Sequence, residues 1–142
     1  MSEWLFHGEN MNDQNTDILL KAFPNLFRGD FYFECGNGWF ELIAKVAAFI
    51  DTVTTDCEIC EVKEKFGRLR IYLSLQLDEQ GVPTIPEEDL SGIYKFIYSI
   101  EEASANICEE CGVSLNAGNR QSQKTMGYWM RNICSPCYKK SP

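Results

Sequence analysis

The sequence lacks the features that mark membrane proteins, secreted proteins and most enzymes. Its longest uninterrupted apolar run is Val46 to Ile50, far shorter than the roughly 20 residues of a transmembrane helix. Met1 to Glu9 has neither a basic segment nor a long apolar stretch, so we expect no secretory signal. His7 is the only histidine, and no Gly-rich phosphate loop, Gly-x-Ser-x-Gly elbow or Asp-rich calcium loop occurs. We therefore expect a cytoplasmic, non-enzymatic protein that does not enter membranes.

Charge divides the chain at about Cys108. With 142 residues, of which 44% are hydrophobic and 24% charged, the chain is typical of one globular domain. Its net charge of −8 disfavours sequence-independent binding to nucleic acid or to anionic membranes. Residues 1–107 carry 8 basic and 19 acidic side chains, whereas residues 108–142 carry 5 basic and 2 acidic ones. We predict an acidic body over 1–107 and a C-terminal module over 108–142 that packs on it, because no flexible linker separates the two.

The hydrophobic pattern predicts an α+β fold. Apolar residues recur every three or four positions in some segments and alternate with polar residues in others. Thr84 and Glu87 fit a capping box before the last helix, and Asn37 or Gly38 is expected to cap the second one. The expected elements are helices over 13–23, 39–53 and about 86–105, a brief strand over 31–33, and two strands within 59–77 that turn at Phe66-Gly67-Arg68. This is a small antiparallel hairpin packed with two main helices, followed by a four-cysteine zinc knuckle or ribbon.

Seven cysteines are the unusual feature of the composition. An odd number cannot pair completely within one chain, which favours a reducing compartment. Cys108-x₂-Cys111 and Cys134-x₂-Cys137 are separated by 22 residues, close to the spacing of four-thiolate zinc sites. Four buried cysteines or two disulfides are the alternatives. Because four protein ligands leave no position for water or substrate, a single bound Zn²⁺ would be structural.

The other cysteines leave more than one interpretation open. Cys57-x₂-Cys60 could bind a second metal with Cys35 and His7, or act as a redox pair, although it lacks the following helix of a thioredoxin-like site. Small buried hydrophobic residues are the more ordinary interpretation of these cysteines. His7 lies in a terminal segment, where an incidental histidine is favoured.

Acidic pairs that could serve acid–base chemistry have simpler interpretations. Glu87, Glu88 and Asp89 lie in the first turn of an expected helix, where their charge complements the helix dipole. Glu101-Glu102 and Glu109-Glu110 are interpreted as solvated surface groups.

Two segments in which cations alternate with aromatic residues are candidate binding surfaces. In the C-terminal loop, such residues could bind phosphates and stack on bases, or the aromatic residues could cover the metal site. At the hairpin tip, an exposed Phe66 could anchor a protein partner, or it could fold back on its own strands. The candidates are Arg120, Lys124, Tyr128, Trp129 and Arg131 in the loop, and Lys63, Lys65, Phe66, Arg68 and Arg70 in the hairpin.

Three segments together resemble a group of small proteins encoded by bacteriophages and prophages. They are Cys35-Gly36-Asn37-Gly38-Trp39-Phe40 with Leu42-Ile43, then Val62-Lys63-Glu64-Lys65-Phe66-Gly67-Arg68-Leu69-Arg70-Ile71-Tyr72, and then Cys108-Glu109-Glu110-Cys111-Gly112 with Trp129, Cys134 and Cys137. The resemblance covers about residues 31–137. It implies an α/β body with a C-terminal zinc knuckle and a bacterial host cytoplasm as the setting.

Two functions follow as hypotheses. The first is a non-enzymatic, zinc-stabilised module that inhibits or modulates a host protein or an antiviral defence protein by binding it through the acidic body. The alternative is a nucleic-acid-binding zinc ribbon that uses the basic, aromatic loop between Cys111 and Cys134.

Overall fold

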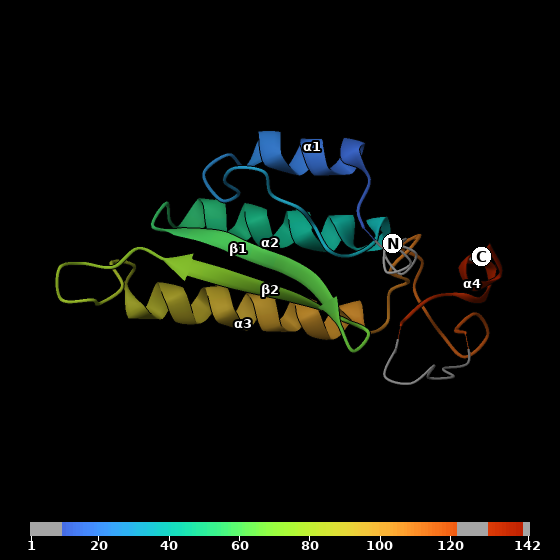
Figure 1. The fold of residues 1–142 in the computed structure, drawn as a ribbon. Coiled ribbons are helices and arrows are strands. Elements are labelled where there is room, and N and C mark those ends of the chain that lie inside the picture. The colour runs from blue at the N-terminus through green and yellow to red at the C-terminus, as the bar shows by residue number, and fades with distance from the viewer. Residues whose placement is uncertain (1–9, 122–130, 141–142) are drawn as a thin grey trace.

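The computed structural model describes residues 10–121 and 131–140. It confirms the α+β class: a two-stranded antiparallel sheet lies between helices, and the C-terminal segment lies beyond the hairpin tip (Figure 1). None of the described helices is long and apolar enough to cross a lipid bilayer. The elements are α1 (Asp13–Ala22), the 3₁₀ turn η2 (Asn37–Trp39), α2 (Phe40–Val53), β1 (Cys57–Lys65), β2 (Arg68–Leu75), α3 (Glu87–Ser104) and α4 (Ser135–Lys140).

The first two helices begin in different ways. α1 has a side-chain cap, because the Asn12 side chain accepts a hydrogen bond of 2.8 Å from the Asn15 backbone N–H. α2 follows η2 and has no side-chain cap. Neither Asn37 nor Gly38 caps it, which corrects the expectation. The Asn37 Oδ1 atom instead accepts from the Asn12 backbone N–H at 2.9 Å and so connects α1 to η2.

β1 and β2 form a hairpin with a two-residue turn. Phe66 and Gly67 both have positive φ, 53° and 82°, as the type I′ hairpin turn requires. Glycine adopts this conformation readily, whereas Phe66 adopts it at a steric cost. The register pairs Lys65 with Arg68, and a bulge between Ile59 and Glu61 leaves Cys60 unpaired. Phe66 remains 62% exposed, so it does not fold back on its strands.

The outer edge of β1 is covered by the chain that follows α1. The Ile59 N–H donates to the Leu26 carbonyl at 2.8 Å, and the Glu34 N–H donates to the Val62 carbonyl at 2.9 Å. The brief strand expected over 31–33 is wrong, because pairing is limited to an isolated parallel bridge between Glu34 and Lys63.

The capping box expected before α3 is also wrong. Pro86 occupies the N-cap position, and no side chain caps the helix. The Thr84 hydroxyl donates instead to an Asp56 carboxylate oxygen at 3.0 Å, and the Thr84 N–H donates to the Gln76 carbonyl at 3.0 Å. Thr84 is therefore used to hold the loop after β2 against the start of β1.

The main hydrophobic core lies between the sheet and the helices. Leu69 and Ile71 of β2 contribute to it, with the apolar faces of α2 and α3. Phe49 of α2 and Phe96 of α3 stack with ring centroids 4.7 Å apart. Most of the periodic apolar positions read from the sequence face this core, but Leu77 and Tyr94, which the same patterns placed on apolar faces, are 54% and 46% exposed.

A candidate metal centre joined to the body

Four cysteines from the two ends of the C-terminal segment converge on one point. The sulfur atoms of Cys108, Cys111, Cys134 and Cys137 all lie within 4.8 Å of one another, so the group could hold a metal ion. The Cys111 and Cys134 sulfurs are 3.8 Å apart. A disulfide requires about 2.05 Å, whereas the edge of a tetrahedron with metal–sulfur bonds of about 2.3 Å is about 3.8 Å. The spacing therefore matches ligands of one ion.

Backbone hydrogen bonds shape each half of this centre. In the first half, the Gly112 N–H donates to the Cys108 carbonyl and the Cys108 N–H to the Val113 carbonyl, both at 2.9 Å, which closes a tight turn. The second half begins at Cys134, directly before α4. Its backbone N–H donates to the Cys108 sulfur at 3.3 Å and so connects the two halves.

The crowded thiols oppose one another's ionisation. Burial, with hydrogen bonds from neighbouring thiols, raises the pKa of Cys137 well above its usual range, and burial also raises the pKa of Cys111. Burial acts in the same direction on Cys134, but hydrogen bonds from the Cys137 backbone and from the other thiols lower its pKa. The Cys134 thiolate is therefore favoured over those of Cys111 and Cys137, and a bound cation would favour the ionised form of its ligands.

The first half of the metal centre, residues 108–112 (the first knuckle), packs directly on two glycines of the body. The Gly38 N–H donates to the Glu109 carbonyl at 2.7 Å. A Cβ atom at Gly38 would lie 2.0 Å from the Cys108 carbonyl oxygen, and one at Gly36 would lie 2.5 Å from the Glu109 carbonyl oxygen. Only glycine permits this approach of two backbones. The presence of glycine at positions 36 and 38 of the Cys-Gly-Asn-Gly motif is therefore explained by the close packing of the first knuckle.

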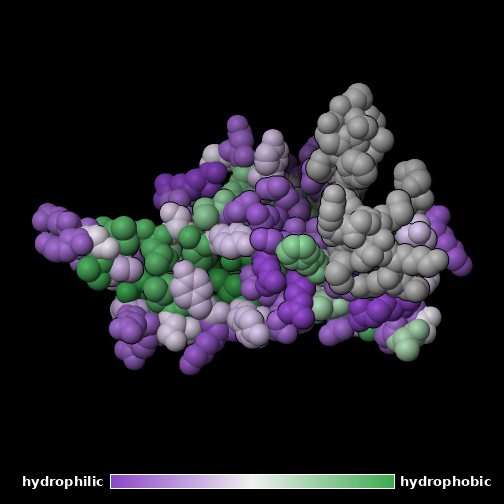
Figure 2. All heavy atoms as spheres, turned by 60° about the horizontal axis from the view of Figure 1, so that its bottom comes forward, coloured by the Kyte–Doolittle hydropathy of each residue, from purple (hydrophilic) through white to green (hydrophobic). Residues whose placement is uncertain are grey.

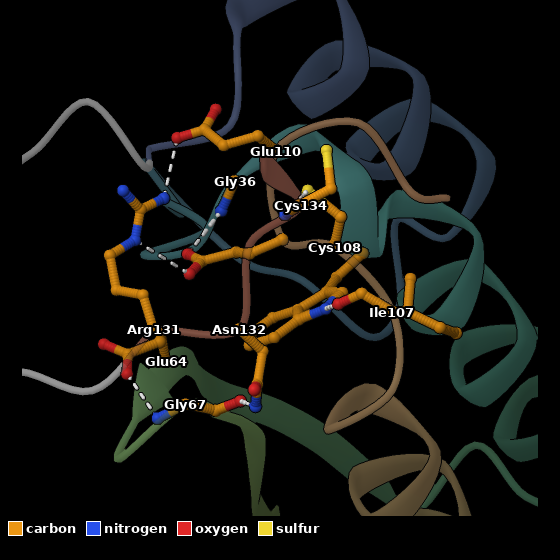
Figure 3. A network of polar contacts seen from close by, with 11 residues as sticks. Gly36, Glu64, Gly67, Ile107, Cys108, Glu110, Arg131, Asn132 and Cys134 are labelled. Carbon is orange, nitrogen blue, oxygen red and sulfur yellow. Dashed lines mark hydrogen bonds and ion pairs between the residues drawn. The ribbon is translucent and has the colours of Figure 1, made fainter. Parts of the chain in front are cut away.

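Glu109 is buried between the knuckle and the body. It is 0% exposed, which corrects the expectation of a solvated surface residue. Its carboxylate accepts a hydrogen bond from the Gly36 N–H at 3.0 Å and lies 3.5 Å from the Arg131 guanidinium. The same guanidinium reaches Glu110 at 2.7 Å (Figure 3). A buried carboxylate without such partners would lower the free energy of unfolding. The folded protein is therefore stable only when the first knuckle packs correctly on the body.

Further polar contacts hold the end of the body, at Ile107, and the C-terminal segment in place. The Trp39 indole N–H donates to the Ile107 carbonyl at 3.0 Å, and the Asn132 side-chain amide donates to the Gly67 carbonyl at 2.6 Å (Figure 3). Arg120 donates to the Asn132 side chain and to the Ala105 carbonyl, at 2.9 and 3.2 Å. Sequence reasoning missed Glu109, Asn132 and Trp39 as junction residues. The one available signal was the pair of glycines before Trp39.

The candidate binding residues of the hairpin lie on one face and are largely paired with acids. Lys63 lies 3.4 Å from Glu61, and its ammonium group is 5.6 Å from the centre of the Tyr72 ring. Lys65 lies 5.8 Å from the Phe66 ring centre. Of the two arginines, Arg68 forms an ion pair with Glu102, and Arg70 lies 3.4 Å from Glu101.

The candidate residues of the C-terminal loop divide into two groups. Arg120 and Arg131 make the junction contacts given above, so both guanidinium groups serve the structure. Lys124, Tyr128 and Trp129 lie outside the described residues.

The remaining cysteines do not assemble into a second centre within the part of the chain that the structure describes. Cys35 and Cys57 are buried, whereas Cys60 is exposed at the bulge. Burial, followed by the charges of Glu109, Glu64 and Glu34, raises the pKa of Cys35 well above its usual range. His7 lies outside the described residues.

Comparisons with known proteins give no match for this chain, whether with protein-family models, with curated proteins or with solved structures.

Proposed function

We propose that this chain is a non-enzymatic protein-binding module that one structural Zn²⁺ stabilises, and that its partner is a host protein or an antiviral defence protein met during phage infection. The observation that carries the zinc assignment is the closed set of four thiols, which fills every position of a tetrahedral ion. The phage setting rests on the sequence resemblance.

The body presents an excess of acidic groups to a partner. Residues 1–107 have 19 acidic and 8 basic side chains. Four of those cations, Arg28, Lys63, Arg68 and Arg70, lie in ion pairs with glutamates. Glu87 and Glu88 at the start of α3 are exposed, at the end of the molecule away from the metal centre (Figure 1). Such a surface complements a basic, nucleic-acid-binding surface on the partner and speeds association with it.

The test uses the partner captured from host cells and purified. We expect its affinity for this chain to fall at least about tenfold between about 50 and 300 mM salt. The double change Glu87→Gln with Glu88→Gln should weaken binding, whereas Asp13→Asn with Asp17→Asn on α1 serves as a matched control. The chain should also displace nucleic acid from the partner. An affinity that does not change with salt would contradict binding through the acidic body.

Nucleic-acid binding is a second candidate because of the hairpin. The register places Lys63 opposite Arg70 and Lys65 opposite Arg68, and like charges directly opposite each other destabilise a sheet. Glu61, Glu102 and Glu101 already offset the charges of Lys63, Arg68 and Arg70, so an anionic ligand beside Phe66 would pair with Lys65. Gel-shift assays with single- and double-stranded DNA and RNA at low salt test this function, and Lys65→Gln should reduce any shift. Absence of a shift at low salt would remove this candidate.

A further inference from the structure

The apolar side of β2 is buried at one end of the strand and open at the other. Alternation places one row of apolar side chains on the same side of the chain: Leu69, Ile71, Leu73, Leu75 and Leu77. Exposure increases along this row, from 0% at Leu69 to 54% at Leu77. Leu73 and Leu75 lie between these extremes and pack against the core only in part. The row therefore extends past the part of the fold that covers it.

α3 runs beside this row in the opposite direction (Figure 1). The Ile71 N–H donates to the Glu101 carboxylate at 2.9 Å, which shows how the two elements align. A strand rises about 3.3 Å per residue and a helix about 1.5 Å, so Leu77 comes level with the first turn of α3. Tyr94 lies two helical turns before Glu101, on the same side of the helix, and is 46% exposed. The open half of the row therefore has an exposed aromatic side chain beside it.

The loop after β2 adds another exposed apolar side chain. The Asp78 N–H donates to the Val82 carbonyl at 2.8 Å, and an antiparallel bridge pairs Leu77 with Pro83. Val82 is therefore held close to Leu77, and it is 53% exposed. Figure 2 shows hydrophobic residues gathered in this half of the molecule, away from the C-terminal segment; a patch of this kind marks an interaction surface. The open apolar surface consists of Leu73, Leu75, Leu77, Val82 and Tyr94.

Acidic residues adjoin the open apolar surface. Residues 71–94 include five acidic residues and no basic one. Glu79 is exposed in the loop after β2, and Glu87 and Glu88 are exposed at the start of α3. The two α3 glutamates line an open hollow together with Ser91. This part of the molecule therefore offers an apolar centre with negative charge at its margin.

We propose that the open apolar surface binds a cationic amphipathic helix of the partner protein, an inference that rests on the proposed function and names its docking surface. Apolar side chains at three- or four-residue spacing pack on the apolar centre. Lysine or arginine side chains beside them pair with the carboxylates of Glu79, Glu87 and Glu88. Charge complementarity selects this occupant, because a nucleic acid or a second copy of the same surface would bring negative charge against negative charge.

A helix suits this surface better than a strand does. α3 lies along the edge of β2 and obstructs an added strand there. A helix satisfies its own backbone hydrogen bonds, so it needs only apolar contacts and opposite charge from the surface that binds it. A model helix with those two properties alone should therefore bind.

A synthetic helix tests this chemistry without the partner. The probe is a fluorescent peptide of about 18 residues, made of leucine and lysine with the leucines on one helical face. Fluorescence anisotropy at about 50 mM salt should give a Kd of about 10–100 μM. A peptide of the same composition in rearranged order should bind at least about tenfold more weakly, and so should a peptide with glutamate in place of lysine.

Substitutions at exposed positions test the location. Leu77→Gln with Val82→Gln should raise the Kd of the leucine–lysine peptide at least about tenfold and leave the urea midpoint of the chain unchanged. Ile18→Gln on α1 is the matched control, because Ile18 is 48% exposed, and it should leave the Kd as in the wild type. Peptide binding should also move the backbone amide chemical shifts of residues 73–98 and not those of α1.

Three results would overturn the proposal: no peptide binding at about 50 mM salt, an equal Kd for the ordered and rearranged peptides, or an equal Kd for the wild type and the double variant. The purified partner separates this inference from the proposed function. If its affinity falls with salt but tolerates Leu77→Gln with Val82→Gln, the docking surface is wrong and the proposed function stands. If its affinity does not change with salt while the peptide still binds through Leu77 and Val82, the proposed function is wrong and the surface retains its preference for cationic helices.

Discussion

The body and the C-terminal segment are stabilised by different means. Among the described residues, the body buries a core cluster of 21 hydrophobic residues, whereas the core of the C-terminal segment comprises Cys108, Leu115, Ile133 and Cys134. Two of those four are candidate metal ligands. A cluster this small cannot offset the entropy of ordering a segment of this length. The comparison indicates that the body folds by burial of apolar surface and that the segment needs a further source of stability, which a metal ion held by the four thiols would supply.

Removal of the metal should produce the largest effect. We expect a chelator, or Cys134→Ser, to unfold residues 108–140 while the body keeps its helices and its β1–β2 pairing. Hydrogen exchange resolved by residue should lose protection after Ile107 and retain it in α2 and β2. Metal analysis should find about one zinc per wild-type chain and almost none in Cys134→Ser.

Cys60→Ser provides the control for this experiment, because Cys60 is exposed and remote from the four-thiol group. It should keep the zinc and the protection of the segment. If Cys134→Ser kept both as well, the four-thiol assignment would be wrong.

The next largest effect should come from the junction between the two regions. Gly38→Ala would place a methyl group 2.0 Å from the Cys108 carbonyl oxygen, so the knuckle must move away from η2. We expect a loss of about 3 kcal/mol in the free energy of unfolding, measured by urea denaturation. Gly92→Ala is the control, because nothing lies within 4 Å of a Cβ at that helical position. It should stabilise α3 by about 0.5–1 kcal/mol.

Periodic features of the fold could be predicted from the sequence, and features that depend on distant partners could not. The apolar stripe of α2 and the alternation in β2 report local geometry directly, so both elements were found. Thr84 fits a capping box locally, yet its hydroxyl binds Asp56, 28 residues away in the chain. Residues 31–33 have strand-forming side chains, but only Glu34 reaches β1.

The candidate site shows the same division. The spacing of the cysteines alone identified the four residues that converge, because two short pairs must each curl round one ion. Glu109 is charged and is followed by another glutamate, so its sequence context favours a solvent-exposed side chain. Its burial depends on Gly36 and Arg131, one from each region, and this partnership has no local signature.

Asn132→Ala should lower the free energy of unfolding by an intermediate amount. It tests how much the contact between the C-terminal segment and the hairpin turn contributes to stability. The change removes the donor to the Gly67 carbonyl and the acceptor for Arg120. We expect a loss of about 2 kcal/mol in the free energy of unfolding. The amide protons of the 66–67 turn should also exchange faster. Asn25→Ala, at an exposed loop position, should change neither quantity, and equal effects from the two variants would contradict the role of Asn132.

The smallest effect on the free energy of unfolding should come from Cys35, a buried thiol of the body. This effect should be measurable only at alkaline pH. Burial and the nearby carboxylates of Glu109, Glu64 and Glu34 raise its pKa in the folded protein, whereas an unfolded thiol ionises near pH 8.5. The unfolded state therefore loses the proton first. The protonated Cys35 thiol therefore makes its full contribution to the free energy of unfolding below about pH 8.5. This contribution falls as the pH rises further, by at most about 1.4 kcal/mol per pH unit. Cys35→Ala should flatten the pH dependence of unfolding between about pH 8.5 and 10, and the exposed-site control Cys60→Ala should leave it as in the wild type. If both variants kept the wild-type slope, the alkaline loss of stability would have to originate in another group.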